Sequence, residues 1–183
     1  MKKFVCLCLA ALLLFSFVGC TAKMTAAENF LLALKSMDVQ TMKAALVCDT
    51  GVASLYAKLD TSLSEEKTQC LRELYALLRY TIGEEKEENG ARYLEITLKI
   101  PNMQRIIELT QTKILVMAEP ASHIISDMIE DGTVANTLML DKTVSVKMIE
   151  NNGEWLVSYE DAENAAFREA LMLTEMLNFV SAN

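Results

Sequence analysis

Residues 93–101, Tyr-Leu-Glu-Ile-Thr-Leu-Lys-Ile-Pro, decide the fold class, because apolar and polar side chains alternate along them. In an extended chain every second side chain points to the same face, so this stretch has one apolar face and one polar face. The pattern predicts a half-buried strand. Pro101 ends that strand, because proline has no backbone N–H to donate to a neighbour. The apolar face consists of Leu94, Ile96, Leu98 and Ile100.

The residues before this strand predict its partner. Tyr80 and Ile82 begin a second alternating stretch, and Asn89-Gly90 separates the two. Asn-Gly favours the positive φ angles of a two-residue hairpin turn. The sequence therefore predicts an antiparallel hairpin around residues 80–100.

A second hairpin follows about 40 residues later. Val144, Val146 and Met148 alternate, Asn152-Gly153 supplies the turn, and the return strand places Trp155, Val157 and Tyr159 on one face. A tryptophan in such a strand usually supplies a large buried area. We therefore expect Trp155 in the core, with Ile96 and Val146 among its neighbours.

The remaining segments have helical spacing. Thr25-Ala26-Ala27-Glu28 resembles a capping box, Asp38 and Ser64 are candidate caps of later helices, and residues 52–59 predict a short helix. Asn102 can cap a long helix whose buried face consists of Ile106, Thr110, Ile114 and Met117. Pro120 interrupts that helix, which resumes as far as Gly132. A last helix is predicted over residues 162–180, with Ala166, Phe167, Ala170, Leu171 and Leu177 inward.

This order of elements predicts an α+β fold. Helices pack on one face of a curved antiparallel sheet of about four strands, formed by two hairpins on either side of a long helical insert. The helix over residues 162–180 is an addition at the C-terminal side.

The first 20 residues indicate export. Lys2 and Lys3 precede an apolar run from Phe4 to Val18, which is shorter than the roughly 20 residues that a membrane-spanning helix needs. This layout is typical of a secretory signal. The run ends in Phe17-Val18-Gly19-Cys20, which resembles the lipobox of bacterial lipoproteins, with phenylalanine where leucine is usual.

The lipobox resemblance implies a processed, lipid-modified chain. It implies a signal peptide over residues 1–19 and a diacylglycerol on the Cys20 thiol. Residues 20–24 then form a short tether before the first helix signal, and the remaining length predicts a single domain over residues 25–183. The mature protein would then sit at the outer face of the cytoplasmic membrane. An ordinary secretory signal and an uncleaved helical anchor are the alternatives.

Charge and cysteine content limit the functional classes. Without residues 1–19 the chain keeps 15 basic and 25 acidic residues, so we expect no nucleic-acid partner and no electrostatic binding to anionic lipid. Cys48 and Cys70 can form one disulfide in an exported protein, or they can be separate buried residues on two helices.

Few residues are candidates for chemistry. His123, the only histidine, shares a helix face with Glu119 and Asp127 and is expected to be exposed rather than catalytic. The glutamates at 84, 85, 87 and 88 adjoin a turn and are expected to be a solvated hairpin tip rather than a metal site. We expect no cofactor and no metal.

The chain also resembles cystatin-like domains of the nuclear-transport-factor-2 superfamily. The resemblance lies in residues 30–38, Phe-Leu-Leu-Ala-Leu-Lys-Ser-Met-Asp, and in the hairpin over residues 144–157. The whole pattern is similar to exported bacterial lipoproteins that carry such a domain of unknown function. The family supplies no catalytic residues to carry over.

Two functions follow from this resemblance. The first is a non-catalytic module that binds an envelope protein, a peptide or a small apolar ligand. The second is a small lyase or isomerase that uses the cavity of the same fold, for which Asp141 and Tyr159 are the candidate residues. The binding module is the reading that we favour.

Overall fold

The computed structural model describes residues 22–47, 53 and 63–183. Four antiparallel strands form one sheet in the order β1-β2-β3-β4. The strands are β1 Arg79–Glu88, β2 Ala91–Pro101, β3 Met139–Asn151 and β4 Glu154–Val157. The α+β fold with two hairpins around a helical insert is thus confirmed.

The register of the sheet explains the alternation in the sequence. Leu94 pairs with Val146 and Ile96 with Val144, and all four side chains are buried on the inner face. On the outer face the exposed hydroxyl oxygens of Thr97 and Thr143 lie 3.1 Å apart. The sheet therefore has one apolar and one solvated face, as its antiparallel pattern predicts.

Both hairpins turn at the residues that the sequence indicates. Asn89 and Gly90 have φ angles of 51° and 79°, and Asn152 and Gly153 have 54° and 84°. Positive φ at both central residues is the type I′ geometry that matches the twist of the flanking strands.

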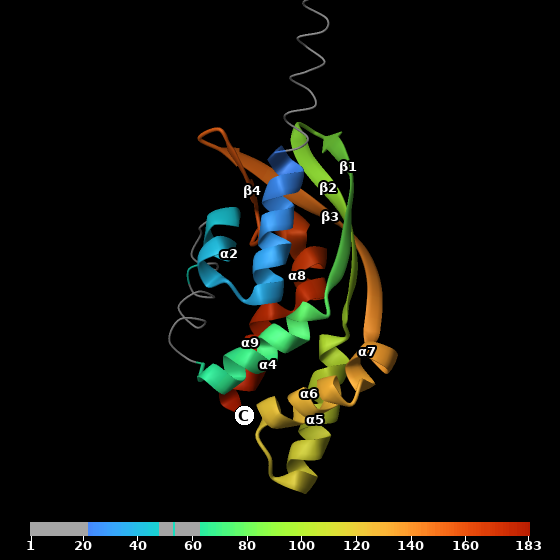
Figure 1. Ribbon diagram of the computed structural model, residues 1–183. Helices are drawn as coiled ribbons and strands as arrows, with labels where there is room; N and C mark the ends of the chain where they lie inside the picture. Colours follow the sequence, from blue (N-terminus) through green and yellow to red (C-terminus); the bar gives the residue numbers. More distant parts are fainter. Residues whose placement is uncertain (1–21, 48–52, 54–62) are drawn as a thin grey trace, which may run out of the picture.

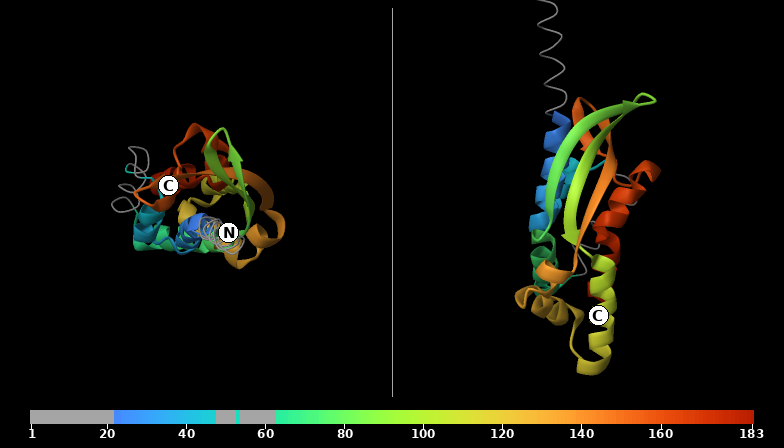
Figure 2. Two further views of the ribbon diagram at one scale, coloured as in Figure 1. Left: turned by 90° about the horizontal axis from the view of Figure 1, so that it is seen from above. Right: turned by 90° about the vertical axis from the view of Figure 1, so that its right-hand side faces the viewer.

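Helices surround the inner face of the sheet (Figures 1 and 2). One helix covers residues 22–36. The other helices that lie wholly within the described residues are α2 Val39–Ala45, α4 Glu65–Ala76, α5 Met103–Met117, α6 Ala121–Glu130, α7 Thr133–Thr137, the 3₁₀ helix Ala162–Asn164, α8 Ala165–Leu171 and α9 Leu173–Ala182. The caps Asp38, Ser64 and Asn102 are confirmed, because each side chain accepts a hydrogen bond from a backbone N–H of its first turn. The predicted helix over residues 52–59 falls almost entirely outside the described residues.

An aromatic cluster joins the two ends of the chain over the sheet. Phe30 of the first helix lies with its ring centroid 5.9 Å from those of both Tyr159 and Phe167. All three side chains are buried. The cluster fixes the helix of residues 22–36 beside α8 on the inner face.

The first helix begins earlier than the capping box predicts. Residues 22–24, which we expected in a tether, are helical, so Thr25 lies inside the helix and is not its cap. The reason is a tertiary contact: Lys23 is buried and its Nζ lies 2.7 Å from a carboxylate oxygen of Glu85 in β1. Docking onto the sheet stabilises the extra turn.

Trp155 was predicted in the core, but it lies at the margin and packs against the core as a partly buried residue. It is only partly buried and pairs with Glu150 next to the β3–β4 turn. Its ring is covered by Lys23, whose Nζ lies 4.2 Å from the ring centroid. Because β4 has only four residues, a side chain one step from the turn cannot reach the centre of the sheet.

The predicted C-terminal helix is divided in two. Met172 adopts φ 46° and separates α8 from α9. In a continuous helix the Leu171 carbonyl would accept from the N–H of residue 175, but here it accepts from the Tyr75 hydroxyl at 2.9 Å. Phe167, Ala170, Leu171 and Leu177 are buried as expected, whereas Ala166 is exposed.

Candidate functional site

The α5–α6 helical hairpin ends in a loop at one extremity of the molecule. Asn102 caps α5 through the N–H of Arg105, and Ala118 closes the helix in the left-handed conformation. Pro120 then starts α6, because its fixed φ suits a helix N-terminus. The interruption at Pro120 is confirmed, and it produces a protruding tip.

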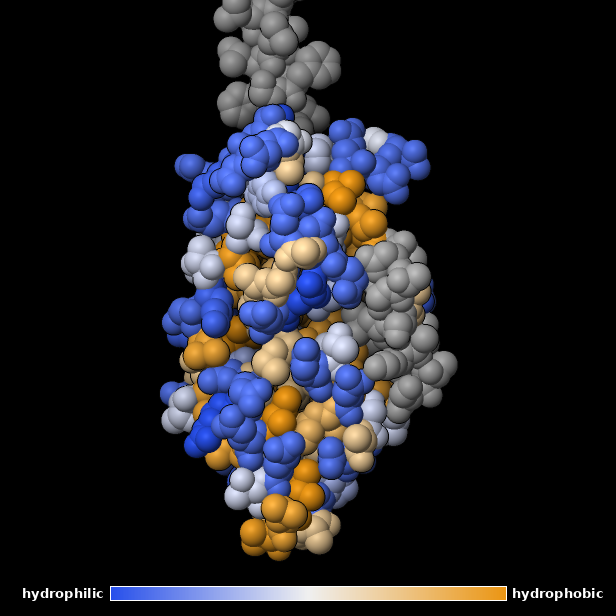
Figure 3. Space-filling view, turned by 180° about the vertical axis from the view of Figure 1, so that it is seen from behind, coloured by the Kyte–Doolittle hydropathy of each residue, from blue (hydrophilic) through white to orange (hydrophobic). Residues whose placement is uncertain are grey.

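The tip carries apolar side chains in solvent. Leu115 is 87% exposed, Val116 82% and Met117 47%. We call these three residues the apolar tip. Met117 was predicted on the buried face with Ile106 and Thr110, but α5 extends past the helices that cover that face (Figure 1). The space-filling view shows apolar residues gathered at this lower end (Figure 3).

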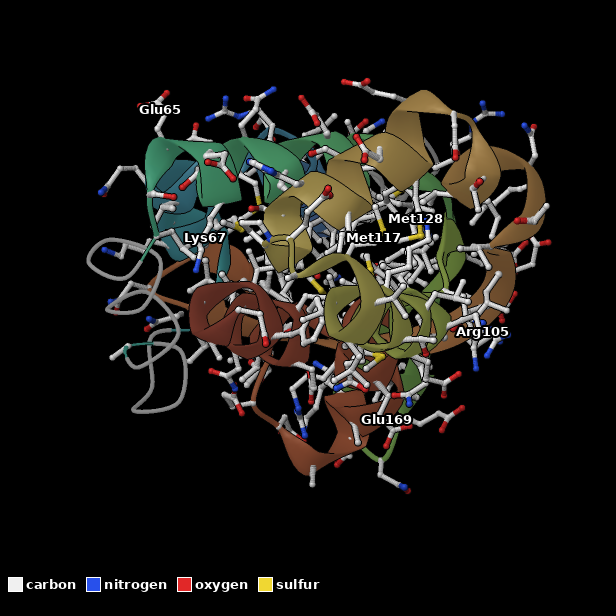
Figure 4. All side chains as sticks on the ribbon, turned by 90° about the horizontal axis from the view of Figure 1, so that it is seen from below. Glu65, Lys67, Arg105, Met117, Met128 and Glu169 are labelled. Atoms are coloured by element: carbon white, nitrogen blue, oxygen red, sulfur yellow. The ribbon has the colours of Figure 1, made fainter. Side chains whose placement is uncertain are left out.

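Exposed apolar side chains that are grouped together, unlike ones scattered singly, can mark a contact surface. Seen from below, the charged residues Glu65, Arg105 and Glu169 lie around the rim, whereas Met117 and Met128 lie nearer the middle (Figure 4). The apolar tip is therefore the strongest candidate for a contact surface. Sequence reasoning missed it, although Ile114, Leu115, Val116 and Met117 in succession cover more than one helix face.

Polar contacts hold α6 against α4 and so position the tip. The Ser122 hydroxyl donates to Glu66 Oε1 at 2.6 Å, and His123 Nε2 lies 3.1 Å from the same oxygen. Ser122 is buried, while the side chains of His123 and Glu66 are more than half exposed.

These three residues do not form a catalytic triad. In such a triad the histidine lies between the hydroxyl and the carboxylate, and it removes the hydroxyl proton. Here the glutamate is the shared acceptor, so His123 cannot act as a base toward Ser122 in this arrangement. His123 is exposed as predicted, but its partner is Glu66 of another helix rather than Glu119 or Asp127.

The two candidate catalytic residues of the enzyme hypothesis, Asp141 and Tyr159, lie in different environments. Tyr159 is buried in the aromatic cluster, and Asp141 is exposed on β3. The inner face that would form a catalytic cavity is filled at this point by Phe30 and Phe167. The structure therefore gives the pair no shared site.

The four glutamates before the first hairpin turn lie in different environments. Glu84, Glu87 and Glu88 are exposed, as predicted for a hairpin tip. Glu85 instead turns inward to Lys23, because the register shifts between Ile82 and Glu85. Among the described residues, no group of three His, Cys, Asp or Glu side chains could hold a metal ion.

Cys70 is a buried, free thiol in α4. Burial raises its pKa to about 12, so it is not a nucleophile at neutral pH. Both Cys48, its predicted disulfide partner, and Cys20, the predicted lipid site, lie outside the described residues.

A polar cleft of about 280 Å³ lies where α8 meets α9. Its charged lining consists of Glu160, Arg168, Glu169 and Glu175. The Arg168 guanidinium donates to the Tyr159 and Asp161 carbonyls, at 2.5 and 2.7 Å, which fixes the turn after β4. Arg168, on the wall of this cleft, thus has a structural role.

Comparisons with known proteins identify no family. No family model and no curated protein match the chain. A solved structure from Bacillus subtilis, described as a "putative lipoprotein (ycdA)", is similar with 18% identity and a TM-score of 0.37. The alignment covers 74% of this chain and 44% of that one, so this chain spans less than half of its length. In the described part of the chain, none of the helices is long and apolar enough to cross a membrane.

Proposed function

We propose that this protein is a lipoprotein of the bacterial cell envelope and that it binds a partner protein through its apolar tip. In this proposal residues 1–19 are a signal peptide and Cys20 carries the lipid at the outer face of the cytoplasmic membrane. The domain would be a non-catalytic interaction module with a cystatin-like fold.

The position of the apolar tip carries the proposal. The helix of residues 22–36 begins at the end of the molecule opposite the α5–α6 loop (Figure 1). A lipid attached near the start of this helix would hold that end at the bilayer and point Leu115, Val116 and Met117 away from it. A protruding apolar surface directed away from the membrane suits insertion into a pocket of another protein.

The lipobox at Phe17-Val18-Gly19-Cys20 supports the anchoring, and the exposed side chains support the contact. We do not propose the lyase or isomerase, because Asp141 and Tyr159 do not share a cavity.

Charged substitutions at the tip test the contact. The double variant Leu115→Glu/Val116→Glu should fold normally, with a free energy of unfolding within about 0.5 kcal/mol of the wild type, because both side chains are already in water. Leu32→Glu is the matched control, since Leu32 is 49% exposed on another helix.

The measurement is site-specific photo-crosslinking from position 117 in the lipidated full chain on its own membranes. We expect one protein adduct that forms with the wild type and with Leu32→Glu and is lost with the double variant. An adduct of equal yield in all three proteins, or the absence of any adduct, would exclude the tip as the contact surface.

A further inference from the structure

The long strand β3 has an edge that is only partly used. β3 has 13 residues, and residues 139–148 pair with β2 on one side. On the other side β4 pairs only with Met148–Asn151. Below residue 148, no described strand lies against this second edge; the 3₁₀ helix Ala162–Asn164 and α8 are described elements that also contact β3.

The register shows which backbone groups point toward it. Asn151 and Glu154 flank a two-residue turn and are therefore a hydrogen-bonded pair, so the odd residues of β3 direct their N–H and C=O groups toward the second edge. At Lys147 these groups are satisfied within the chain. The Asn164 Oδ1 accepts from the Lys147 N–H at 2.7 Å, and the Lys147 carbonyl accepts from the Asn164 Nδ2 at 3.1 Å and from the Ser158 N–H at 3.2 Å.

The next three odd residues have no such partner. The edge-directed backbone groups of Asp141, Thr143 and Ser145 bond to no other described residue, and all three residues are exposed. Because all three residues are exposed and an unpaired buried backbone group is costly, we infer that these groups face water. They form a row of donors and acceptors long enough for a short strand.

The outer edge of β1 differs from this row. β1 carries a register shift between Ile82 and Glu85 and a run of exposed acidic side chains beside it. Bulges and charges of this kind keep edges from pairing with other chains. Over residues 141–145, β3 continues its regular register with β2 and has no register shift.

We propose that an extended segment of a partner protein adds to the sheet beside β3 and pairs with the backbone of Asp141, Thr143 and Ser145. The added strand would continue a ladder that already exists, since β4 and the Asn164 amide occupy the same edge above it. Binding of this kind takes its affinity from main-chain hydrogen bonds and its selectivity from alternate side chains.

Lys142 and Leu140 define the side chains that the segment should carry. Both are even-numbered residues of β3, whose side chains point to the inner face, but both remain exposed. Within the described part of the chain, Lys142 forms no ion pair. In antiparallel addition the residue opposite Lys142 belongs to a non-hydrogen-bonded pair, in which side chains are closest. The segment therefore carries an acidic residue there and an apolar residue two positions away, opposite Leu140.

A library of linear 12-residue peptides displayed on phage, selected against the lipidated full chain in detergent, tests this. Thr143→Pro removes only the edge-directed N–H and leaves the β2–β3 hydrogen bonds in place, whereas the control Thr143→Val keeps that N–H. Selected peptides should show the acidic-apolar alternation. They should bind Thr143→Val like the wild type and Thr143→Pro roughly tenfold more weakly.

Amide hydrogen exchange on the wild-type protein also tests pairing at the β3 edge, and it does not depend on whether Thr143→Pro folds. A bound peptide should slow exchange at Asp141, Thr143 and Ser145. Equal affinity for the two variants, protection elsewhere, or a selection without binders would overturn the proposal. Protection of the same amides by dimerisation would assign the edge to a second copy instead. Because the edge and the apolar tip are separate, Leu115→Glu/Val116→Glu should leave peptide binding unchanged.

Discussion

Cys70 illustrates how its surroundings determine the chemistry of a single side chain. Its thiol is enclosed by the core between α4 and the neighbouring helices, and desolvation is the main cause of its raised pKa. The sequence showed a cysteine at a helical position suited to packing, but the degree of burial depends on α6, which is about 50 residues away.

We predict that Cys70 makes the fold sensitive to alkali. The thiol pKa is about 12 in the folded protein and near 9.0 when it is unburied, so the unfolded chain loses its proton first. The contribution of the protonated Cys70 thiol to the free energy of unfolding is therefore fully present below pH 9. It is lost as the pH rises toward 12, by at most about 1.4 kcal/mol per pH unit. Urea unfolding at pH 8 and pH 10.5 should show a smaller decline for Cys70→Ala than for the wild type. Equal declines would mean that Cys70 does not contribute.

Single residues were predicted well where the signal is local. The turns Asn89-Gly90 and Asn152-Gly153 and the caps Asp38, Ser64 and Asn102 depend on neighbours in the sequence and were confirmed. The contact of His123 with Glu66 was missed, because the two helices approach each other only in the folded protein.

At the scale of elements, the first helix is fastened to the sheet by a mostly buried ion pair. The side chains of Lys23 and Glu85 are 7% and 13% exposed, and Arg92 lies 3.3 Å from the same Glu85 oxygen. Lys86 and Glu95 form a pair of equal length, but their side chains are 52% and 44% exposed. The two ion pairs have the same N–O distance but differ in burial, so comparing them isolates the effect of burial on their strength.

Lys23→Ala should lower the free energy of unfolding by about 2–3 kcal/mol, because it leaves Glu85 with only one partner in a poorly solvated place. Lys86→Ala should change it by less than about 0.5 kcal/mol, since exposed pairs contribute little. Urea denaturation measures both. A similar effect of the two substitutions would show that burial does not set the strength of the Lys23 pair.

Ala118 ends α5 in a conformation that alanine adopts reluctantly, with φ 55°. Glycine has no Cβ to clash there, so Ala118→Gly should raise the free energy of unfolding by roughly 0.5–1 kcal/mol. Thermal unfolding checks this, with Ala166→Gly as a control at an exposed position inside α8, where glycine should destabilise. A loss of stability in Ala118→Gly would refute the strain argument.

Element boundaries were harder to predict than element types. The division at Met172 depends on the Tyr75 hydroxyl, and the early start of the first helix depends on Glu85, so neither has a local signal. Of the apolar tip only Met117 was predicted, on a buried helix face, because periodicity indicates which face of a helix is apolar but not where the covering helices end.

At the scale of the whole molecule, the lipid and the apolar tip lie at opposite ends in our proposal. Cys20→Ser should abolish incorporation of labelled fatty acid and leave the precursor uncleaved, because the thiol is the acceptor. Metabolic labelling followed by electrophoresis measures both. Equal labelling of the mutant and the wild type would contradict the assignment of Cys20.

The aromatic cluster has a consequence for how the chain acquires its fold. Phe30 packs against Tyr159 and Phe167, which lie about 130 residues later, whereas each strand of the sheet pairs with the next one along the chain. Local pairings form early, and contacts across a long loop form late. The helix of residues 22–36 therefore cannot complete this contact until α8 has been synthesised. During that interval the chain depends on whatever else shields Phe30 from water.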